Sequence, residues 1–269
     1  DSLGINSTNL THDGYKEIRG YTDAELIDVS KEIIETRRVK DEQEIEYLRK
    51  ACNIASEAVE ELPDYIEVGM KEYEIAAELS YLMRKKGASG DAFDLIVATG
   101  NNSAEPHYST GERELKEGDF LLMDFGALYK KYRSDLSRTY VAGEPSEKQR
   151  RMYDTVLMAH EKALDAIKSG VYGPEVYKLV RDAIDETEFK GRFVHGLGHS
   201  IGLLEHDYNR HGYIFAKEGG CELKENMVLT VEPGIYIPGY GGVRIEDDVR
   251  VTSDGYELLS KADRNLRVI

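Results

Sequence analysis

Four carboxylates stand where an acidic side chain is least expected, inside or beside apolar stretches of the sequence. Asp124 interrupts the run FLLMDFG, and Asp135 follows in the segment YRSDLSRTY. Glu232 interrupts VLTVEP, and Glu246 ends the segment VRIE. Because a buried carboxylate without a partner costs several kcal/mol, these four acids predict a positive charge close to them.

Each pair of acids lies on the two arms of a predicted β-hairpin, and in both hairpins the two acids are predicted to face each other. Like charges directly opposite in a strand pair destabilise it, which again calls for a cation between them. The predicted facing pairs are Asp124 with Asp135, for a turn between Tyr129 and Lys130, and Glu232 with Glu246, for a turn centred on Gly239.

Three kinds of partner could neutralise these acids. Solvent readily explains a single acid on a strand, but not two facing pairs in apolar strands. A neighbouring arginine, Arg133 or Arg244, could neutralise one acid but not all four. Two divalent cations would balance four carboxylates, and a carboxylate-rich set with one histidine suits Mn²⁺, Co²⁺, Fe²⁺ or Zn²⁺. We therefore expect a site for two divalent cations.

The segment HGLGHSIG offers two candidate histidine ligands, His195 and His199. Their spacing is that of a helical zinc site, but Gly196 and Gly198 between them disfavour a helix. An extended chain with alternating glycines lets the backbone approach a metal or a substrate closely. These residues favour one histidine as a ligand without deciding which.

Helices and extended segments that must position these residues recur in the same order in the two halves of the chain. Asp41 with Glu44, and Ser146 with Gln149, form capping boxes that predict helix starts. The order predicts an α+β fold, with one sheet that carries helices on one face. The predicted helices are 41–62, 71–86, 146–168 and 174–188, and the predicted extended segments are 93–99, 120–141, 193–204, 227–237 and 242–251.

Composition narrows the class of protein further. The 51 Asp and Glu residues against 35 Lys and Arg give a formal net charge of -16, which disfavours nucleic acid and anionic membranes as partners. No apolar run approaches the ~18 residues of a transmembrane helix, and no signal peptide is visible. Two cysteines, Cys52 and Cys221, cannot form a disulfide framework. We expect a soluble cytoplasmic protein.

Five segments match the motifs of a known family in the expected order, over about residues 40–260. They are PHY (106–108), MDFGALYKKYRSDLSRT (123–139), HGLGHSIGLLEHD (195–207), TVEPGIY (230–236) and GGVRIEDDV (241–249). With these motifs the chain resembles the pita-bread superfamily of two-metal aminopeptidases and prolidases, in its proline-peptidase branch. The resemblance implies two pseudo-symmetric halves around a mostly antiparallel curved sheet. It also implies metal-dependent hydrolysis of Xaa-Pro bonds in short peptides, by an Xaa-Pro dipeptidase or an Xaa-Pro aminopeptidase.

The resemblance also implies roles for individual residues. Of the implied ligands, Asp135 and Glu246 would bridge two divalent ions. His107 and His206 match the two non-ligand histidines that lie beside the substrate in this family, and Glu232 could act as the general base as well as a ligand. The full set of implied metal ligands is Asp124, Asp135, His199, Glu232 and Glu246.

Three further positions bear on the site. Arg244 matches an arginine linked to substrate or carboxylate recognition, and a salt bridge to a ligand carboxylate is the competing interpretation. His195 matches a position without a catalytic role. Lys131 stands where the first hairpin of the family usually has glycine, and because lysine is unfavourable at positive φ, a wider turn is expected.

Proline peptidases of this family usually carry an additional N-terminal domain and form homodimers. We expect residues 1–40 to be a remnant of that domain plus a linker, in a truncated or processed chain, and residues 41–269 to be the catalytic domain. Three alternatives remain: a methionine aminopeptidase-like exopeptidase, a creatinase-like member, and a non-catalytic pita-bread binding protein. The complete ligand set disfavours the last two. The sequence does not separate a dipeptidase from an aminopeptidase.

Overall fold

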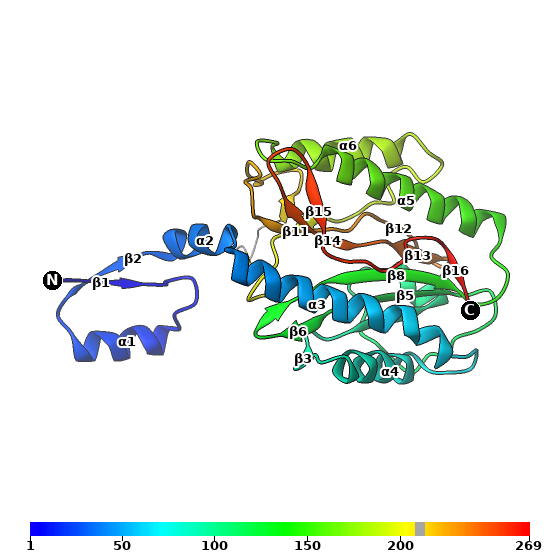
Figure 1. Cartoon of the computed structure of the whole chain (residues 1–269), viewed down its shortest axis with the longest axis horizontal. Coiled ribbons are helices and arrows are strands. Elements are labelled where there is room, and N and C mark those ends of the chain that lie inside the picture. Colours follow the sequence, from blue (N-terminus) through cyan, green and yellow to red (C-terminus); the bar gives the residue numbers. More distant parts are fainter. Residues whose placement is uncertain (208–212) are drawn as a thin grey trace.

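The computed structural model describes residues 1–207 and 213–269. Its main body has two similar halves, and in each half a pair of helices packs over strands (Figure 1). The first half contains α3 (Glu42–Glu61), α4 (Glu72–Lys85), β3 (Gly90–Asp91), β4 (Ile96–Thr99), β5 (Phe120–Phe125), β6 (Ala127–Tyr129), β7 (Tyr132–Arg133) and β8 (Leu136–Val141). The second contains α5 (Glu147–Ala166), α6 (Gly173–Asp185), β9 (Gly198–His199), β10 (Tyr213–Phe215), β11 (Val228–Val231), β12 (Gly234–Ile237), β13 (Gly241–Arg244), β14 (Asp247–Val251) and β15 (Tyr256–Leu258).

Most strand pairs in the main body are antiparallel, as the resemblance implied. With the C-terminal strand β16 (Arg267–Val268), the hydrogen-bonded orders are β16-β8-β5-β4, β11-β14-β15, β12-β13, β10-β9 and β3-β6-β7. Strand β16 runs parallel to β8. An isolated bridge between Ser137 and Glu246 joins the strands of the two halves.

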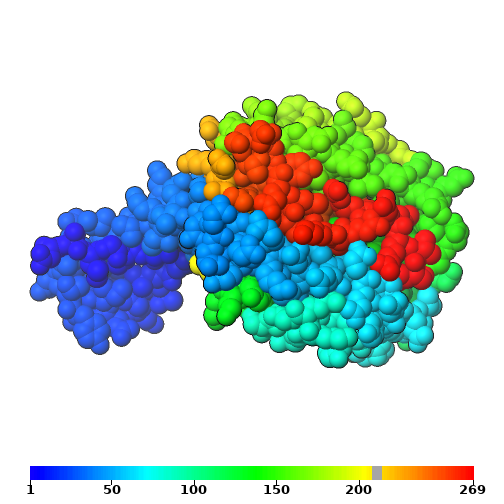
Figure 2. All heavy atoms as spheres, viewed as in Figure 1, coloured from blue at the N-terminus to red at the C-terminus, as the bar shows by residue number. Residues whose placement is uncertain are grey.

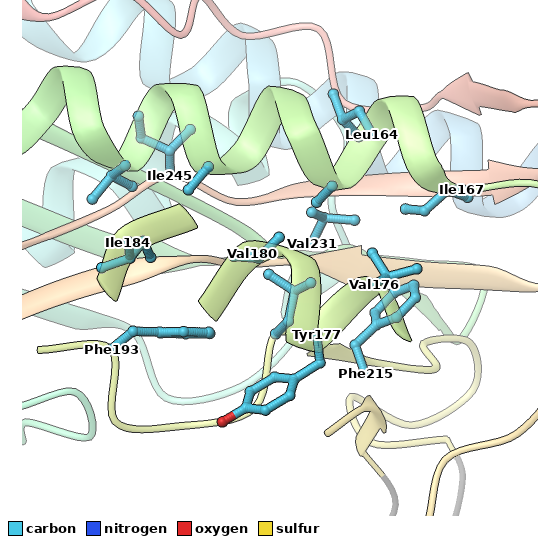
Figure 3. Close-up of a cluster of buried hydrophobic side chains, with 14 of the residues drawn as sticks. Leu164, Ile167, Val176, Tyr177, Val180, Ile184, Phe193, Phe215, Val231 and Ile245 are labelled. Carbon is cyan, nitrogen blue, oxygen red and sulfur yellow. The ribbon is translucent and has the colours of Figure 1, made fainter. Parts of the chain in front are cut away.

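The four predicted helices of the main body are confirmed, with ends that differ by a few residues. Both predicted capping boxes are present, at Asp41 with Glu44 and at Ser146 with Gln149. In the second half, α6 packs Val176, Val180 and Ile184 into a buried apolar cluster with α5 and the strands beneath it (Figure 3). Burial of such side chains is the main force that holds each helix pair on its strands.

The second hairpin region has the predicted register. β12 pairs with β13 so that Gly234 lies opposite Arg244, and β11 pairs with β14 so that Val231 lies opposite Asp247. Glu232 and Glu246 lie between these two paired stretches, and the shared register places them opposite each other.

The first hairpin turns one residue later than predicted. β5 pairs with β8 so that Asp124 lies opposite Ser137, not opposite Asp135. The chain reverses at Lys130 and Lys131, which adopt φ values of 50° and 75°. Positive φ at both central residues is typical of the tight two-residue hairpin turn, so the expected wider turn is wrong as well.

The error in register leaves the faces of the strands unchanged. Side chains alternate between the two faces of a strand, so a register change of two residues keeps each side chain on its face. Asp124 and Asp135 therefore lie diagonally across the hairpin and still point to the same side.

Residues 1–40 form four elements that the sequence patterns did not predict. They are β1 (Ser2–Ile5), α1 (His12–Tyr21), β2 (Glu25–Asp28) and α2 (Ser30–Arg38). β1 and β2 pair in parallel, and α1 buries none of its residues. These first elements project beyond the main body, and α2 connects them to it (Figures 1 and 2). Among the described helices, none combines the length and apolar character needed to cross a membrane.

Candidate metal centre and active site

Asp135, His199 and Glu246 meet in space although they come from distant parts of the chain. Their ligand atoms all lie within 4.8 Å of one another, and all three residues are buried. His199 Nε2 lies 3.5 Å from Asp135 Oδ2 and 3.7 Å from Glu232 Oε1. Four of the five predicted ligands are thus neighbours.

Asp124 lines the same cavity and is held by Arg244. Arg244 Nη2 donates a hydrogen bond of 2.5 Å to Asp124 Oδ2. Asp124 Oδ1 is buried and has no hydrogen-bond partner among the described residues. A buried carboxylate oxygen without a donor fits a cation, because its desolvation is otherwise uncompensated.

Burial controls the protonation of this cluster. Desolvation, reinforced by neighbouring carboxylates, raises the pKa of Asp135 and of Glu246 well above their usual range. Desolvation also raises the pKa of Glu232 to about 8 and lowers the pKa of His199 to about 3. Neutral imidazole and carboxylates are the forms that bind divalent metals, and bound cations would favour the ionised carboxylates. The donor set therefore fits divalent cations.

The two predicted non-ligand histidines lie beside the cluster. The ring of His206 stacks on that of His199, with centroids 3.9 Å apart. His206 is about half exposed, and its hydrogen bond with Glu205 raises its pKa. His107 is exposed and faces the same cavity. Both can therefore reach a bound substrate without replacing a ligand.

A cavity of about 650 Å³ connects these residues. Its lining includes the five predicted metal ligands together with His107 and His206. A space of this size accommodates a short peptide. The predicted metal ligands and the two histidines thus share one accessible cavity.

Comparison with known proteins identifies the family. Residues 46–253 match the model of metallopeptidase family M24. The chain belongs to metallopeptidase family M24. It is 41% identical to the Xaa-Pro dipeptidase of Pyrococcus furiosus, over 99% of this chain and 75% of the relative.

Solved structures confirm the pita-bread fold. The Xaa-Pro dipeptidase from Bacillus anthracis matches with a TM-score of 0.95 at 41% identity, over 100% of this chain and 75% of that one. The X-Pro aminopeptidase from Thermotoga maritima MSB8 also matches with a TM-score of 0.95, at 38% identity, over 100% of this chain and 76% of that one. The resemblance drawn from the five motifs is thereby confirmed for this M24 metallopeptidase.

Arg244 is a buried scaffold residue in this M24 metallopeptidase. Only 2% of it is exposed, and its Nη2 is occupied by Asp124. Its Nε donates to Ser137 Oγ at 2.8 Å, and Ser137 Oγ in turn donates to Glu246 Oε2 at 2.6 Å. Its Nη1 donates to the Tyr236 hydroxyl at 2.8 Å. This geometry favours the salt-bridge interpretation over direct contact with a substrate.

Buried charged residues that the sequence did not identify form hydrogen bonds with the backbone of the predicted ligands. Arg138 donates to Asp247 Oδ1 and to the Glu246 carbonyl, both at 2.8 Å. Asp248 Oδ2 accepts a 2.8 Å hydrogen bond from the backbone N–H of Asp135. A sequence signal was present, since Arg138 lies in a predicted strand in which alternation places it on the face opposite the predicted ligands. Its acidic partner could not be chosen without the tertiary structure.

The loop that carries His206 is anchored by the N-terminal part of the chain. Asp207 is buried and pairs with Arg37, while Lys40 Nζ lies 3.6 Å from Asp207 Oδ2. Lys40 Nζ also donates to Ser200 Oγ at 3.2 Å. The segment before α3 therefore contacts the active-site loop directly.

His195 and His199 both neighbour Glu232, whose Oε2 lies 3.8 Å from the Nδ1 of His195. The Nε2 of His195 lies 2.9 Å from the Tyr236 hydroxyl, and its Nδ1 lies 2.6 Å from the Gly196 carbonyl oxygen. His195 is not part of the cavity lining. These contacts agree with a structural role.

Proposed function

We propose that this M24 metallopeptidase hydrolyses Xaa-Pro bonds of short peptides with two divalent cations, Mn²⁺, Co²⁺, Zn²⁺ or Fe²⁺. The observation that carries the proposal is the buried carboxylate cluster. Its acids have raised pKa values, and Asp124 Oδ1 has no hydrogen-bond partner in the part of the chain that the structure describes. Relatives named as Xaa-Pro dipeptidase and X-Pro aminopeptidase support the proline specificity. The residues that would hold the cations are Asp124, Asp135, His199, Glu232 and Glu246.

Different residues would carry out the separate steps of the hydrolysis. When bound, the cations would supply Lewis acidity and lower the pKa of water towards 7. Glu232, 3.7 Å from His199 at the edge of the cluster, takes a proton from the attacking water and returns it to the proline nitrogen as the C–N bond breaks. His206 and His107 donate hydrogen bonds to the carbonyl oxygen as negative charge develops on it.

The scissile bond of an Xaa-Pro peptide limits the ways in which the site can recognise it. The nitrogen of an Xaa-Pro bond has no hydrogen, so the site need not offer an acceptor there. Recognition then depends on the shape of the proline ring and on contacts with the charged ends of the peptide.

A peptide panel tests the proposal against a methionine aminopeptidase-like specificity. We expect the Mn²⁺-loaded protein to cleave Ala-Pro with a kcat/KM roughly tenfold or more above that for Ala-Ala. Faster cleavage of Met-Ala-Ser than of Ala-Pro would indicate the methionine aminopeptidase-like activity instead. Asp135→Asn, which weakens the metal site, serves as the inactive control, and wild-type activity no greater than this control would indicate a binding protein.

The proposal extends to the organisation of the protein. It includes residues 41–269 as the catalytic domain, residues 1–40 as part of an N-terminal domain plus a linker, and a homodimer in the cytoplasm. The two cysteines, Cys52 and Cys221, are free, which agrees with a reducing compartment. Light scattering after size-exclusion chromatography tests the dimer.

A further inference from the structure

The proposed active site is strongly acidic. Two divalent cations would balance four of its carboxylates; the other two acids are Asp94 and Glu205, and Glu205 pairs with His206. Apart from the bound cations, the cavity lining therefore offers few positive charges to an anionic group of a substrate. The acidic side chains among its described lining residues are Asp94, Asp124, Asp135, Glu205, Glu232 and Glu246.

Arg133 is the only lysine or arginine among the described residues that line this cavity. It precedes Asp135 by two positions, so the two side chains share a face and their Cα atoms lie about 6.6 Å apart. Its backbone N–H donates to the Gly202 carbonyl at 2.9 Å, which fixes the strand against the loop that leads to His206.

The guanidinium of Arg133 is half-buried and available. Within residues 1–207 and 213–269, no side chain or backbone group forms a hydrogen bond or ion pair with it. An arginine at the wall of an acidic cavity with five uncommitted N–H donors is suited to a carboxylate ligand, which it can bind through two parallel hydrogen bonds.

Arg244 cannot bind a substrate carboxylate while it keeps its present hydrogen bonds. Its three nitrogen atoms already donate to Ser137, Tyr236 and Asp124, and it is almost completely buried. Binding a substrate carboxylate there would leave Asp124 without its partner, which is unfavourable for a buried acid.

We infer that Arg133 binds the C-terminal carboxylate of the substrate and thereby favours dipeptides over longer peptides. This inference rests on the proposed Xaa-Pro hydrolysis. In an Xaa-Pro dipeptide the carboxylate lies one residue, at most about 3.6 Å, beyond the scissile carbonyl. If the scissile peptide bond binds at the carboxylate cluster, the C-terminal carboxylate therefore lies within reach of the Arg133 side chain, because Arg133 is only two residues from Asp135. In a longer peptide an uncharged amide occupies this position.

Two paired measurements on the Mn²⁺-loaded protein test the role of Arg133. The first compares kcat and KM for Ala-Pro and for Ala-Pro-amide, which differ only in the terminal charge. The second measures, by calorimetry, the binding of L-proline and of L-prolinamide, which are not consumed. The variants are Arg133→Gln, Arg133→Lys and the neighbouring control Lys131→Gln, which removes the same charge from the exposed turn.

We expect the wild-type preference for Ala-Pro over its amide to fall roughly tenfold or more in Arg133→Gln, mainly through KM. Arg133→Lys should retain part of the preference, and Lys131→Gln should retain all of it. The preference for binding L-proline over L-prolinamide should change in the same order among the variants. A preference that Arg133→Gln leaves unchanged, or that Lys131→Gln lowers equally, would overturn the inference. If wild-type protein cleaved neither peptide, the proposed function would fail, whereas the proline titration would still decide the role of Arg133.

Discussion

His199 and His206 lie ring on ring, yet their surroundings differ sharply. His199 is buried against Asp135 and Glu232, and burial lowers its pKa to about 3. His206 is about half exposed and its pKa is raised by Glu205. A buried neutral imidazole suits a metal ligand, whereas a more basic, accessible one suits a hydrogen-bond donor to substrate.

Substitution of each histidine by alanine should separate these roles. We expect His199→Ala to lose bound metal and activity together. We expect His206→Ala to retain its metal but to lower kcat about 10²-fold, because a donor to the developing oxyanion is removed. Measuring the metal content by mass spectrometry together with kcat for each variant distinguishes a metal ligand from a hydrogen-bond donor. Loss of metal from His206→Ala would show that the two roles are assigned wrongly.

The buried residue His160 should contribute to the pH dependence of stability. His160 faces Asp247, Arg138 and Arg264, and burial lowers its pKa to about 4. The unfolded chain, with an ordinary pKa near 6.5, binds a proton that the folded protein excludes. The contribution of His160 to stability should therefore be full above pH 6.5 and fall by about 3 kcal/mol as the pH drops to 4.

Urea unfolding between pH 4 and pH 7 measures this contribution. His160→Gln should flatten the dependence on pH, although the variant is less stable overall. The exposed control His12→Gln should leave the dependence as in wild type. If His160→Gln kept the wild-type slope, the acid sensitivity would come from another group.

At the scale of elements, the first hairpin stores strain at its turn. Lys131 adopts a φ of 75°, which is unfavourable for a residue with a side chain. We expect Lys131→Gly to raise the free energy of unfolding by about 0.5–1 kcal/mol, since glycine accepts this conformation freely. Thermal unfolding monitors the change. Lys190→Gly, at an exposed lysine without positive φ, should be neutral or destabilising, and a gain equal to that of Lys131→Gly would refute the explanation.

Sequence periodicity predicted the helices and the second hairpin because each has a long apolar face or a distinct glycine-rich turn. The first hairpin was placed one residue early, since lysine gives no signal for positive φ. The elements of residues 1–40 escaped prediction for another reason. α1 buries no residue and therefore lacks an apolar stripe, and β1 and β2 are four residues each.

The chemistry of the site could be predicted from the sequence, but its supporting contacts could not. Asp124, Asp135, Glu232 and Glu246 are recognisable as a group because each acid interrupts or ends an apolar segment. Whether the guanidinium of Arg133 or of Arg244 is free to bind a substrate depends on contacts between distant segments of the chain. Spacing along the sequence does not reveal these contacts.

At the scale of the whole molecule, the proposed metal centre takes its residues from both halves. Asp124 and Asp135 come from the first half, whereas His199, Glu232 and Glu246 come from the second. The bridge between Ser137 and Glu246 and the buried Arg138–Asp247 pair hold the halves in register. Cations bound there would link both halves and add stability to the folded state.

Hydrolysis of Ala-Pro during a titration with Mn²⁺ tests this account most directly. Protein freed of metal by a chelator and returned to buffer should be inactive. Its rate should rise with added Mn²⁺, level off at about two equivalents and vanish when chelator is added again. Hydrolysis that persists in the chelator, or no hydrolysis by folded protein with metal bound, would contradict the proposed metal-dependent Xaa-Pro peptidase.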